Sequence, residues 1–121
     1  MKIGDAIQSA DWKNEKHVPA IEAPDVVKAG EPFKVMVSVG KEIAHPNTTA
    51  HHIAWISVFF KPEGEKFLYP VGRFDFGGHG PVYTNPSVKL SVTIDKPGTL
   101  LAVEQCNIHG LWEGSKEISV E

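Results

Sequence analysis

Apolar and polar residues alternate in two stretches of this chain, which is the pattern of β-strands with one buried face. Between residues 33 and 39 the odd-numbered positions are Phe or Val. Between residues 88 and 94 the even-numbered positions are Val, Leu or Ile. Lys, Met, Ser and Thr fill the positions between them. Both stretches therefore predict half-buried strands whose second face meets solvent.

Residues 53–60 are apolar on both faces, which predicts a central strand or one that a partner subunit covers. Shorter strand candidates lie at residues 20–22, 67–69, 99–105 and 117–120, and turn residues at 28–32, 61–64 and 95–98 separate them. The only stretch compatible with a helix is 3–10. A spacing of about a dozen residues per strand is typical of an antiparallel sandwich. We therefore expect an all-β sandwich of about seven strands with a short N-terminal helix or loop segment.

Composition narrows the possible classes of protein. The 121 residues suit one domain, 1–121, and the single cysteine excludes an internal disulfide. An unpaired thiol favours a reducing cytoplasm, and we expect neither a signal peptide nor a membrane span. A net charge of −3 without a Lys or Arg cluster gives no attraction to nucleic acid. Six histidines, three of them within residues 45–52, are the one anomaly.

Three separated segments carry residue types that bind metals. Cys106 and His109 form a C-x-x-H motif, His45 and His51 flank a short polar loop, and His17 follows Glu-Lys near the N-terminus. A thiolate and an imidazole can share one metal ion when both are deprotonated. Three such segments suggest a single site that the fold assembles.

Other polar residues have plainer interpretations. His52 is adjacent to His51, so in a strand the two point to opposite faces and only one can be a ligand. We expect His52 to pack or to hydrogen-bond, and His79 to be solvated in the glycine-rich loop 76–81. On composition alone, Glu15 and Lys16 are most simply interpreted as a solvated pair in an exposed N-terminal segment.

The donor types favour iron over copper or zinc. A structural zinc site commonly has two or more cysteines, and a blue-copper site often has an axial methionine. The two methionines, Met1 and Met36, do not follow the C-x-x-H motif. Four imidazoles and one thiolate exceed the usual zinc or copper set but leave one open position on iron. A cupredoxin-like electron carrier and a non-catalytic β-sandwich interaction module stay open at this point.

Segments 15–19, 45–53 and 106–112, in this order and spacing, closely resemble superoxide reductases of the one-iron class, neelaredoxin, and the iron domain of desulfoferrodoxin. The resemblance implies an immunoglobulin-like sandwich with a mononuclear iron that reduces superoxide to hydrogen peroxide by one electron. It also implies an axial thiolate from Cys106 and four equatorial imidazoles, from His17, His45, His51 and His109.

The same resemblance implies further roles. Glu15 would close the sixth position of the iron in the ferric state, and Lys16 would lie near the open position. The chain lacks the four-cysteine rubredoxin-like site of desulfoferrodoxins, so we expect one iron per chain. His52 and His79 have no ligand role in the family pattern. A rubredoxin-like electron donor is implied. A homo-oligomer such as a tetramer is expected, because residues 53–60 are apolar on both faces and some relatives are tetramers.

Overall fold

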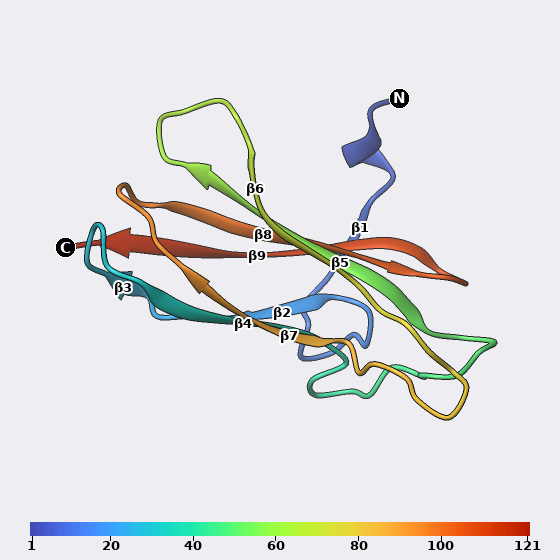
Figure 1. The fold of residues 1–121 in the computed structure, drawn as a ribbon. Helices are drawn as coiled ribbons and strands as arrows, with labels where there is room; N and C mark the ends of the chain where they lie inside the picture. The colour runs from blue at the N-terminus through green and yellow to red at the C-terminus, as the bar shows by residue number, and fades with distance from the viewer.

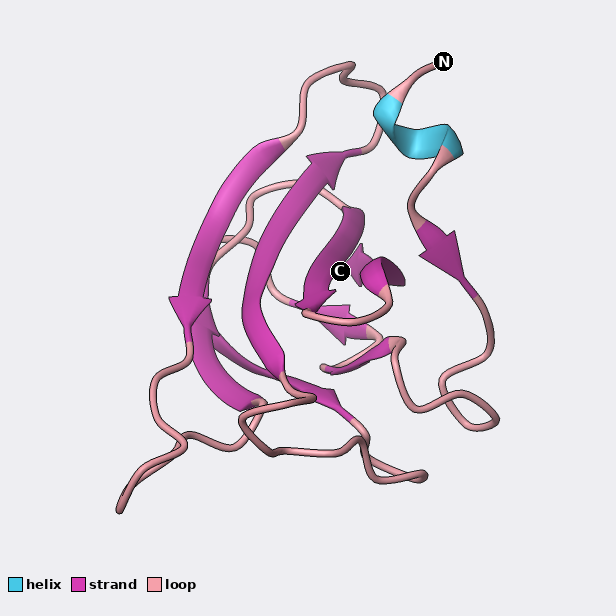
Figure 2. Ribbon diagram, turned by 90° about the vertical axis from the view of Figure 1, so that its right-hand side faces the viewer, coloured by secondary structure: helices cyan, strands magenta, loops and turns pink.

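The computed structural model describes residues 1–121, which form two β-sheets packed face to face (Figures 1 and 2). The larger sheet contains, in order, β1 (Gln8–Ser9), β9 (Gly110–Val120), β8 (Gly98–Cys106), β5 (Ile53–Pro62) and β6 (Tyr69–Asp75), and β3 (Val26–Val27) also pairs with β9. The smaller sheet has the order β2 (Pro19–Glu22), β4 (Phe33–Val39) and β7 (Ser87–Val92). The predicted all-β sandwich is confirmed, although β1 and β3, each two residues long, pair with β9 in parallel.

The core lies between the inner faces of the two sheets, and the alternation within each strand decides which residues reach it. On β8 the inward positions are almost completely buried; they are Leu100, Ala102, Glu104 and Cys106. On β4 the odd-numbered residues of the sequence pattern are buried in the same core. Cys106 is therefore the last inward side chain of β8, at one end of the sandwich.

The strongest strand predictions are confirmed. β4 covers the first alternating stretch, β7 covers the second as far as Val92, and the two strands pair in antiparallel fashion. β5 pairs with β8 on one side and β6 on the other, so the strand that is apolar on both faces is central in its sheet. No helix in the structure is long and apolar enough to cross a membrane.

Three local predictions were wrong. The helix expected over residues 3–10 is only the 3₁₀ turn η1 (Ile3–Asp5), because none of its side chains is buried against the sheets. The strand expected at 67–69 begins at Tyr69 and continues to Asp75, while Phe67 and Leu68 are exposed in the preceding loop. β9 begins at Gly110 rather than near residue 117, so the Cys106 loop is a tight hairpin between β8 and β9.

The histidine and cysteine segments meet at one end of the sandwich because they flank paired strand ends. β2 begins opposite the end of β4, with Pro19 paired with Val39, and β5 begins opposite the end of β8, with Ile53 paired with Cys106. The candidate ligands therefore share this end: His17 before β2, His45 after β4, His51 before β5, Cys106 at the end of β8 and His109 before β9.

Candidate metal centre

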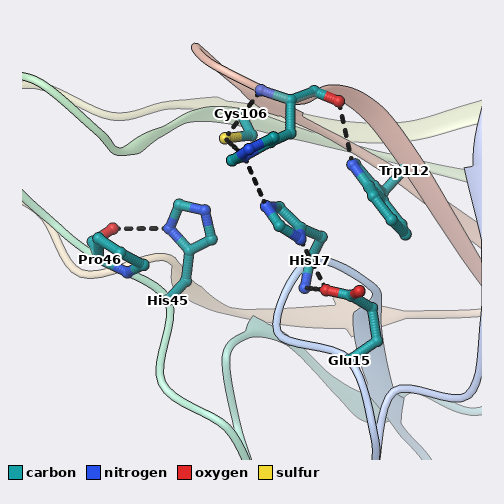
Figure 3. A network of polar contacts seen from close by, with 7 residues as sticks. Glu15, His17, His45, Pro46, Cys106 and Trp112 are labelled. Carbon is teal, nitrogen blue, oxygen red and sulfur yellow. Dashed lines mark hydrogen bonds and ion pairs between the residues drawn. The ribbon is translucent and has the colours of Figure 1, made fainter.

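Four of the predicted ligands converge on one point. The potential ligand atoms of His17, His51, Cys106 and His109 all lie within 4.8 Å of one another. Nδ1 of His109 lies 3.2 Å from Nε2 of His17 and 3.7 Å from Sγ of Cys106 (Figure 3). His109 thus turns its Nδ1 atom, rather than Nε2, toward the other groups.

His45 completes a ring of four imidazoles. The ring centroids of neighbours are 4.9 Å apart for His17 and His45, 4.6 Å for His45 and His51, 5.1 Å for His51 and His109, and 4.9 Å for His109 and His17. The centroids of His17 and His51, on opposite corners, are 6.4 Å apart. The four rings therefore occupy the corners of an approximate square. Sγ of Cys106 is within 4.8 Å of ligand atoms of His17, His51 and His109, so the thiol adjoins three of the four corners.

The nitrogens facing the square lack other partners. Nε2 of His45 and Nε2 of His51 are buried without a hydrogen bond, which is an unusual condition for a polar atom. His45 donates from Nδ1 to the carbonyl oxygen of Pro46 at 2.6 Å, so its Nε2 carries the lone pair (Figure 3). These orphaned acceptors around a thiol fit a bound metal ion, and the donor types fit iron.

Burial keeps two of the imidazoles neutral, as metal binding requires. Loss of hydration lowers the pKa of His45 to about 4, with the neighbouring charges of His17, His51 and Lys16 contributing. Burial, followed by the charges of His109 and Lys16, lowers the pKa of His51 as well. Both side chains therefore offer lone pairs at neutral pH.

Glu15 orients His17. Its carboxylate oxygen Oε1 accepts hydrogen bonds from Nδ1 of His17 at 2.6 Å and from the His17 backbone N–H at 2.8 Å (Figure 3). Burial opposes ionisation of Glu15, but these hydrogen bonds prevail and lower its pKa. Nδ1 of His17 is thereby the donor, and Nε2 is left free toward the square. In this arrangement Glu15 contacts His17 and does not belong to the converging group.

Lys16 is the cation of the site. Its side chain is half-buried, and its positive charge is close enough to contribute to the lowered pKa of both His45 and His51. Glu15 is paired with His17 rather than with Lys16.

The sulfur sits on the interior side of the site. Cys106 is a free thiol with 1% of its surface exposed, and the backbone N–H of His109 donates to its Sγ at 3.4 Å. Glu104, the preceding inward residue on β8, is completely buried, and burial raises its pKa to about 9. By contrast, His109 and its loop neighbours Asn107 and Ile108 are exposed, so the site opens at the surface.

Two supporting residues had no role in the sequence analysis. The Trp112 ring stacks on His17 with centroids 4.7 Å apart, and its indole N–H donates to the His109 carbonyl oxygen at 3.2 Å. The Asn107 side chain accepts from the His52 backbone N–H at 2.8 Å and donates to the Ala50 carbonyl oxygen at 3.0 Å. Their only sequence signal was their place inside segment 106–112, because His17, Ala50 and His52 are distant from them in the chain.

His52 and His79 lie outside the ligand cluster. His52 is packed and hydrogen-bonded, as predicted: its Nδ1 is 2.9 Å from the Thr48 carbonyl oxygen. His79 lies in an exposed glycine-rich loop, as predicted, but its side chain makes contacts that the sequence did not predict. Its ring is half-buried, 4.7 Å from the His52 ring, and its Nε2 lies 2.7 Å from Oδ1 of Asn47.

Known proteins share both the sequence and the fold. Residues 9–115 match the Desulfoferrodoxin family. Neelaredoxin of Megalodesulfovibrio gigas is 56% identical, with 100% of each chain covered, and superoxide reductase of Pyrococcus furiosus is 49% identical, covering 98% of this chain and 99% of that protein. The structure of superoxide reductase (neelaredoxin) from Archaeoglobus fulgidus in the reduced form superposes with a TM-score of 0.85 at 51% identity, covering 93% of this chain and 98% of that one.

This chain therefore belongs to the desulfoferrodoxin family, among the proteins known as superoxide reductases or neelaredoxins.

Proposed function

We propose that this chain reduces superoxide: one superoxide anion, one electron and two protons give one hydrogen peroxide. The observation that carries this function is the convergence of one buried thiol and four imidazoles at the surface end of the sandwich. Relatives that are named superoxide reductase and cover nearly the whole chain support it.

One iron would be held by His17, His45, His51, His109 and Cys106. When bound, iron supplies the single electron by passing from Fe(II) to Fe(III). Neutral imidazoles and one thiolate leave a ferrous site with a single positive charge, which attracts a small anion. Cys106 donates electron density and so favours loss of an electron, and the His109 N–H adjusts that donation.

Metal analysis tests the identity of the cofactor. We expect about one iron per chain in the active protein, because one thiolate is available for one site. The purified protein is assayed for iron, zinc and copper, and its visible spectrum is recorded in both oxidation states. Active protein with stoichiometric zinc or copper and no iron would reject the assignment.

We propose that the positive charge of Lys16 steers superoxide toward the metal centre. The chain carries a net charge of −3, so a local positive charge must offset repulsion of superoxide. Electrostatic steering changes association rates by roughly tenfold or more and weakens as salt screens it. Lys16→Ala is therefore expected to slow the second-order reaction of the ferrous protein with superoxide and to flatten its dependence on ionic strength.

Stopped-flow or pulse measurements across a salt series check the Lys16 prediction. Lys16→Arg should restore most of the rate, because steering depends on charge rather than on side-chain geometry. Lys13→Ala is the matched control, since Lys13 is exposed and lies over the Trp12 ring. An unchanged rate and salt slope in Lys16→Ala would leave Lys16 without this role.

Glu15 is proposed as the sixth ligand in the ferric state only. To reach that position, its carboxylate would exchange the hydrogen bonds to His17 for the metal. As a hard oxygen donor it suits Fe(III) better than Fe(II). Glu15→Ala is expected to change the ferric visible spectrum while leaving superoxide reduction by the ferrous protein largely intact.

A second variant separates the two roles of Glu15. In Glu15→Gln the amide oxygen can still accept from Nδ1 of His17, but the side chain no longer carries the negative charge that favours Fe(III). Its ferric spectrum should therefore resemble that of Glu15→Ala. A large fall in the ferrous rate with an unaltered ferric spectrum in both variants would contradict the capping role.

The reaction also requires an electron donor. Because each turnover consumes one electron, an external donor is required, and we propose a rubredoxin-like protein. Anaerobic mixing of ferric protein with reduced rubredoxin tests this.

A homo-oligomer is proposed through the outer face of β5, where Trp55 and Phe59 are only half-buried, and light scattering tests it. The free thiol of Cys106 favours the reducing cytoplasm, which cell fractionation tests.

A further inference from the structure

The loop of residues 46–50 joins two ligands, His45 and His51, and has no helix or strand of its own. Its internal support is a turn in which the backbone N–H of Thr48 donates to the His51 carbonyl oxygen at 2.9 Å and the N–H of His51 returns a bond at 3.2 Å. The positions of both imidazoles therefore depend on what holds this loop from outside.

Asn107 holds one side of the loop, and a hairpin at residues 77–84 holds the other. The 77–84 hairpin is closed by a bridge between Gly78 and Tyr83 and by the Thr84 N–H, which donates to the Gly77 carbonyl oxygen at 3.1 Å. Its residues are exposed except for His79, which is half-buried. The hairpin thus contributes little to the core, so its contacts with the loop need a separate explanation.

His79 is the centre of these contacts. Its Nε2 lies 2.7 Å from Oδ1 of Asn47, and because that oxygen only accepts, the imidazole is the donor. Asn47 in turn donates from Nδ2 to the Thr84 carbonyl oxygen at 3.3 Å, and Thr49 donates from Oγ1 to the His79 carbonyl oxygen at 3.4 Å. Three hydrogen bonds therefore join the hairpin to the loop between the two ligands.

The ring of His79 adds packing to the hydrogen bonds. It lies between two other rings, 4.7 Å from that of His52 and stacked on that of Tyr83 at 5.7 Å with an interplanar angle of 10°. His52 directly follows the ligand His51. The hairpin therefore contacts the ligand segment at both Asn47 and His52.

The backbone of the hairpin is specialised for this placement. His79 is the only non-glycine residue with a positive φ, at 70°, a conformation that is strained for a residue with a side chain. Gly78 has φ of 120°, and a Cβ there would overlap the backbone of Tyr83. A strained conformation of this kind persists where surrounding contacts determine it, and it often accompanies function.

We propose that His79 is a positioning residue for the metal centre. Through the hydrogen bond to Asn47 and the ring contact with His52, the 77–84 hairpin clamps the 46–50 loop and keeps His45 and His51 at the spacing of the square. This inference rests on the proposed metal site, and it adds a support outside the ligand segments themselves. Its consequence is that breaking the clamp loosens the metal without unfolding the sandwich.

Release of iron measures the clamp directly. The full-length, iron-loaded protein is mixed with excess EDTA, and loss of the thiolate-to-iron absorption band is followed with time. His79→Gly removes the ring while suiting the positive φ, and Asn47→Ala removes the acceptor. Each variant is expected to release iron about tenfold faster than the parent. Roughly tenfold is the lower end of the loss in metal affinity when a residue that supports a metal ligand is removed.

A double-mutant cycle and a rescue separate positioning from general weakening. His79→Gly combined with Asn47→Ala should accelerate release by clearly less than the product of the two single effects, because both substitutions remove the His79–Asn47 hydrogen bond. His79→Gln places an amide N–H near the position of Nε2 and should restore most of the retention. Val82→Ala is the matched control, since Val82 is 73% exposed in the same hairpin. The thermal midpoint of the metal-free protein should be nearly unchanged in all five variants.

The outcomes separate the two proposals. If the parent itself binds no iron, the proposed function fails. If the parent binds iron and both His79→Gly and Asn47→Ala release it at the parent's rate, the clamp is rejected. The clamp is also rejected if the two effects are fully additive in the double variant. It is likewise rejected if the variants that release iron faster also have a lower thermal midpoint of the metal-free protein.

Discussion

Cys106→Ser is expected to abolish the sulfur-to-iron charge-transfer band and most of the superoxide-reducing activity. The thiol is the only one in the chain and lies within 4.8 Å of the ligand atoms of three histidines. An alcohol does not ionise at neutral pH as a thiol does, so serine cannot replace the electron donation of a thiolate. Visible spectra of the oxidised protein and the rate of reaction with superoxide are measured on the same samples.

Cys106→Ala is the companion variant. Both replacements occupy a site with 1% exposure, but alanine adds no polar atom to the interior. If the two variants lose the band and the activity alike while keeping the far-ultraviolet spectrum of a β-protein, the loss belongs to the ligand. Unchanged visible absorption in either variant would remove Cys106 from the site.

Gly114→Ala is expected to cause a large loss of stability without touching a proposed ligand. A Cβ on Gly114, in β9, would overlap the Pro19 carbonyl oxygen and meet the Val18 side chain. These two residues directly follow the ligand His17, so β2 would have to move away from the larger sheet. Overpacking of this kind typically costs about 1–3 kcal/mol. Denaturant unfolding of the metal-free protein measures the loss.

Gly77→Ala is the matched control for Gly114→Ala. A Cβ at Gly77 would meet nothing within 4 Å, and Gly77 does not have a positive φ. Its free energy of unfolding should stay close to that of the parent. Equal stability of the two variants would show that β2 and β9 have more room than their close approach indicates.

Alternation of apolar residues was sufficient to predict the strands that have one clearly buried face, β4 and β7, and the central position of β5. It failed for β6, where Pro70 and Gly72 interrupt the pattern and most residues are exposed. It also failed for the first half of β9, because Gly110 and Gly114 hide the strand from a count of apolar positions. Close approach of backbones, which glycine permits, has no signature in hydrophobicity.

Candidate ligands could be predicted because their residue types are rare here and occur in three compact segments. The supports around them could not, since each joins segments that are distant in the chain. Asn107 reaches Ala50, Trp112 stacks on His17, and His79 meets Asn47 only after the strands have paired. The use of Nδ1 by His109 likewise depends on the hairpin that folds it back toward Cys106.

The stoichiometry of the reaction with superoxide is the most direct test of the proposed activity. The iron-loaded protein, reduced beforehand and freed of excess reductant, is mixed with a known amount of superoxide below the iron concentration. Hydrogen peroxide, oxygen and oxidised iron are then measured. We expect one hydrogen peroxide and one ferric iron for each superoxide consumed, with no oxygen released. Release of oxygen with half as much peroxide would contradict the proposed activity, and so would superoxide that decays at its uncatalysed rate while the iron stays ferrous.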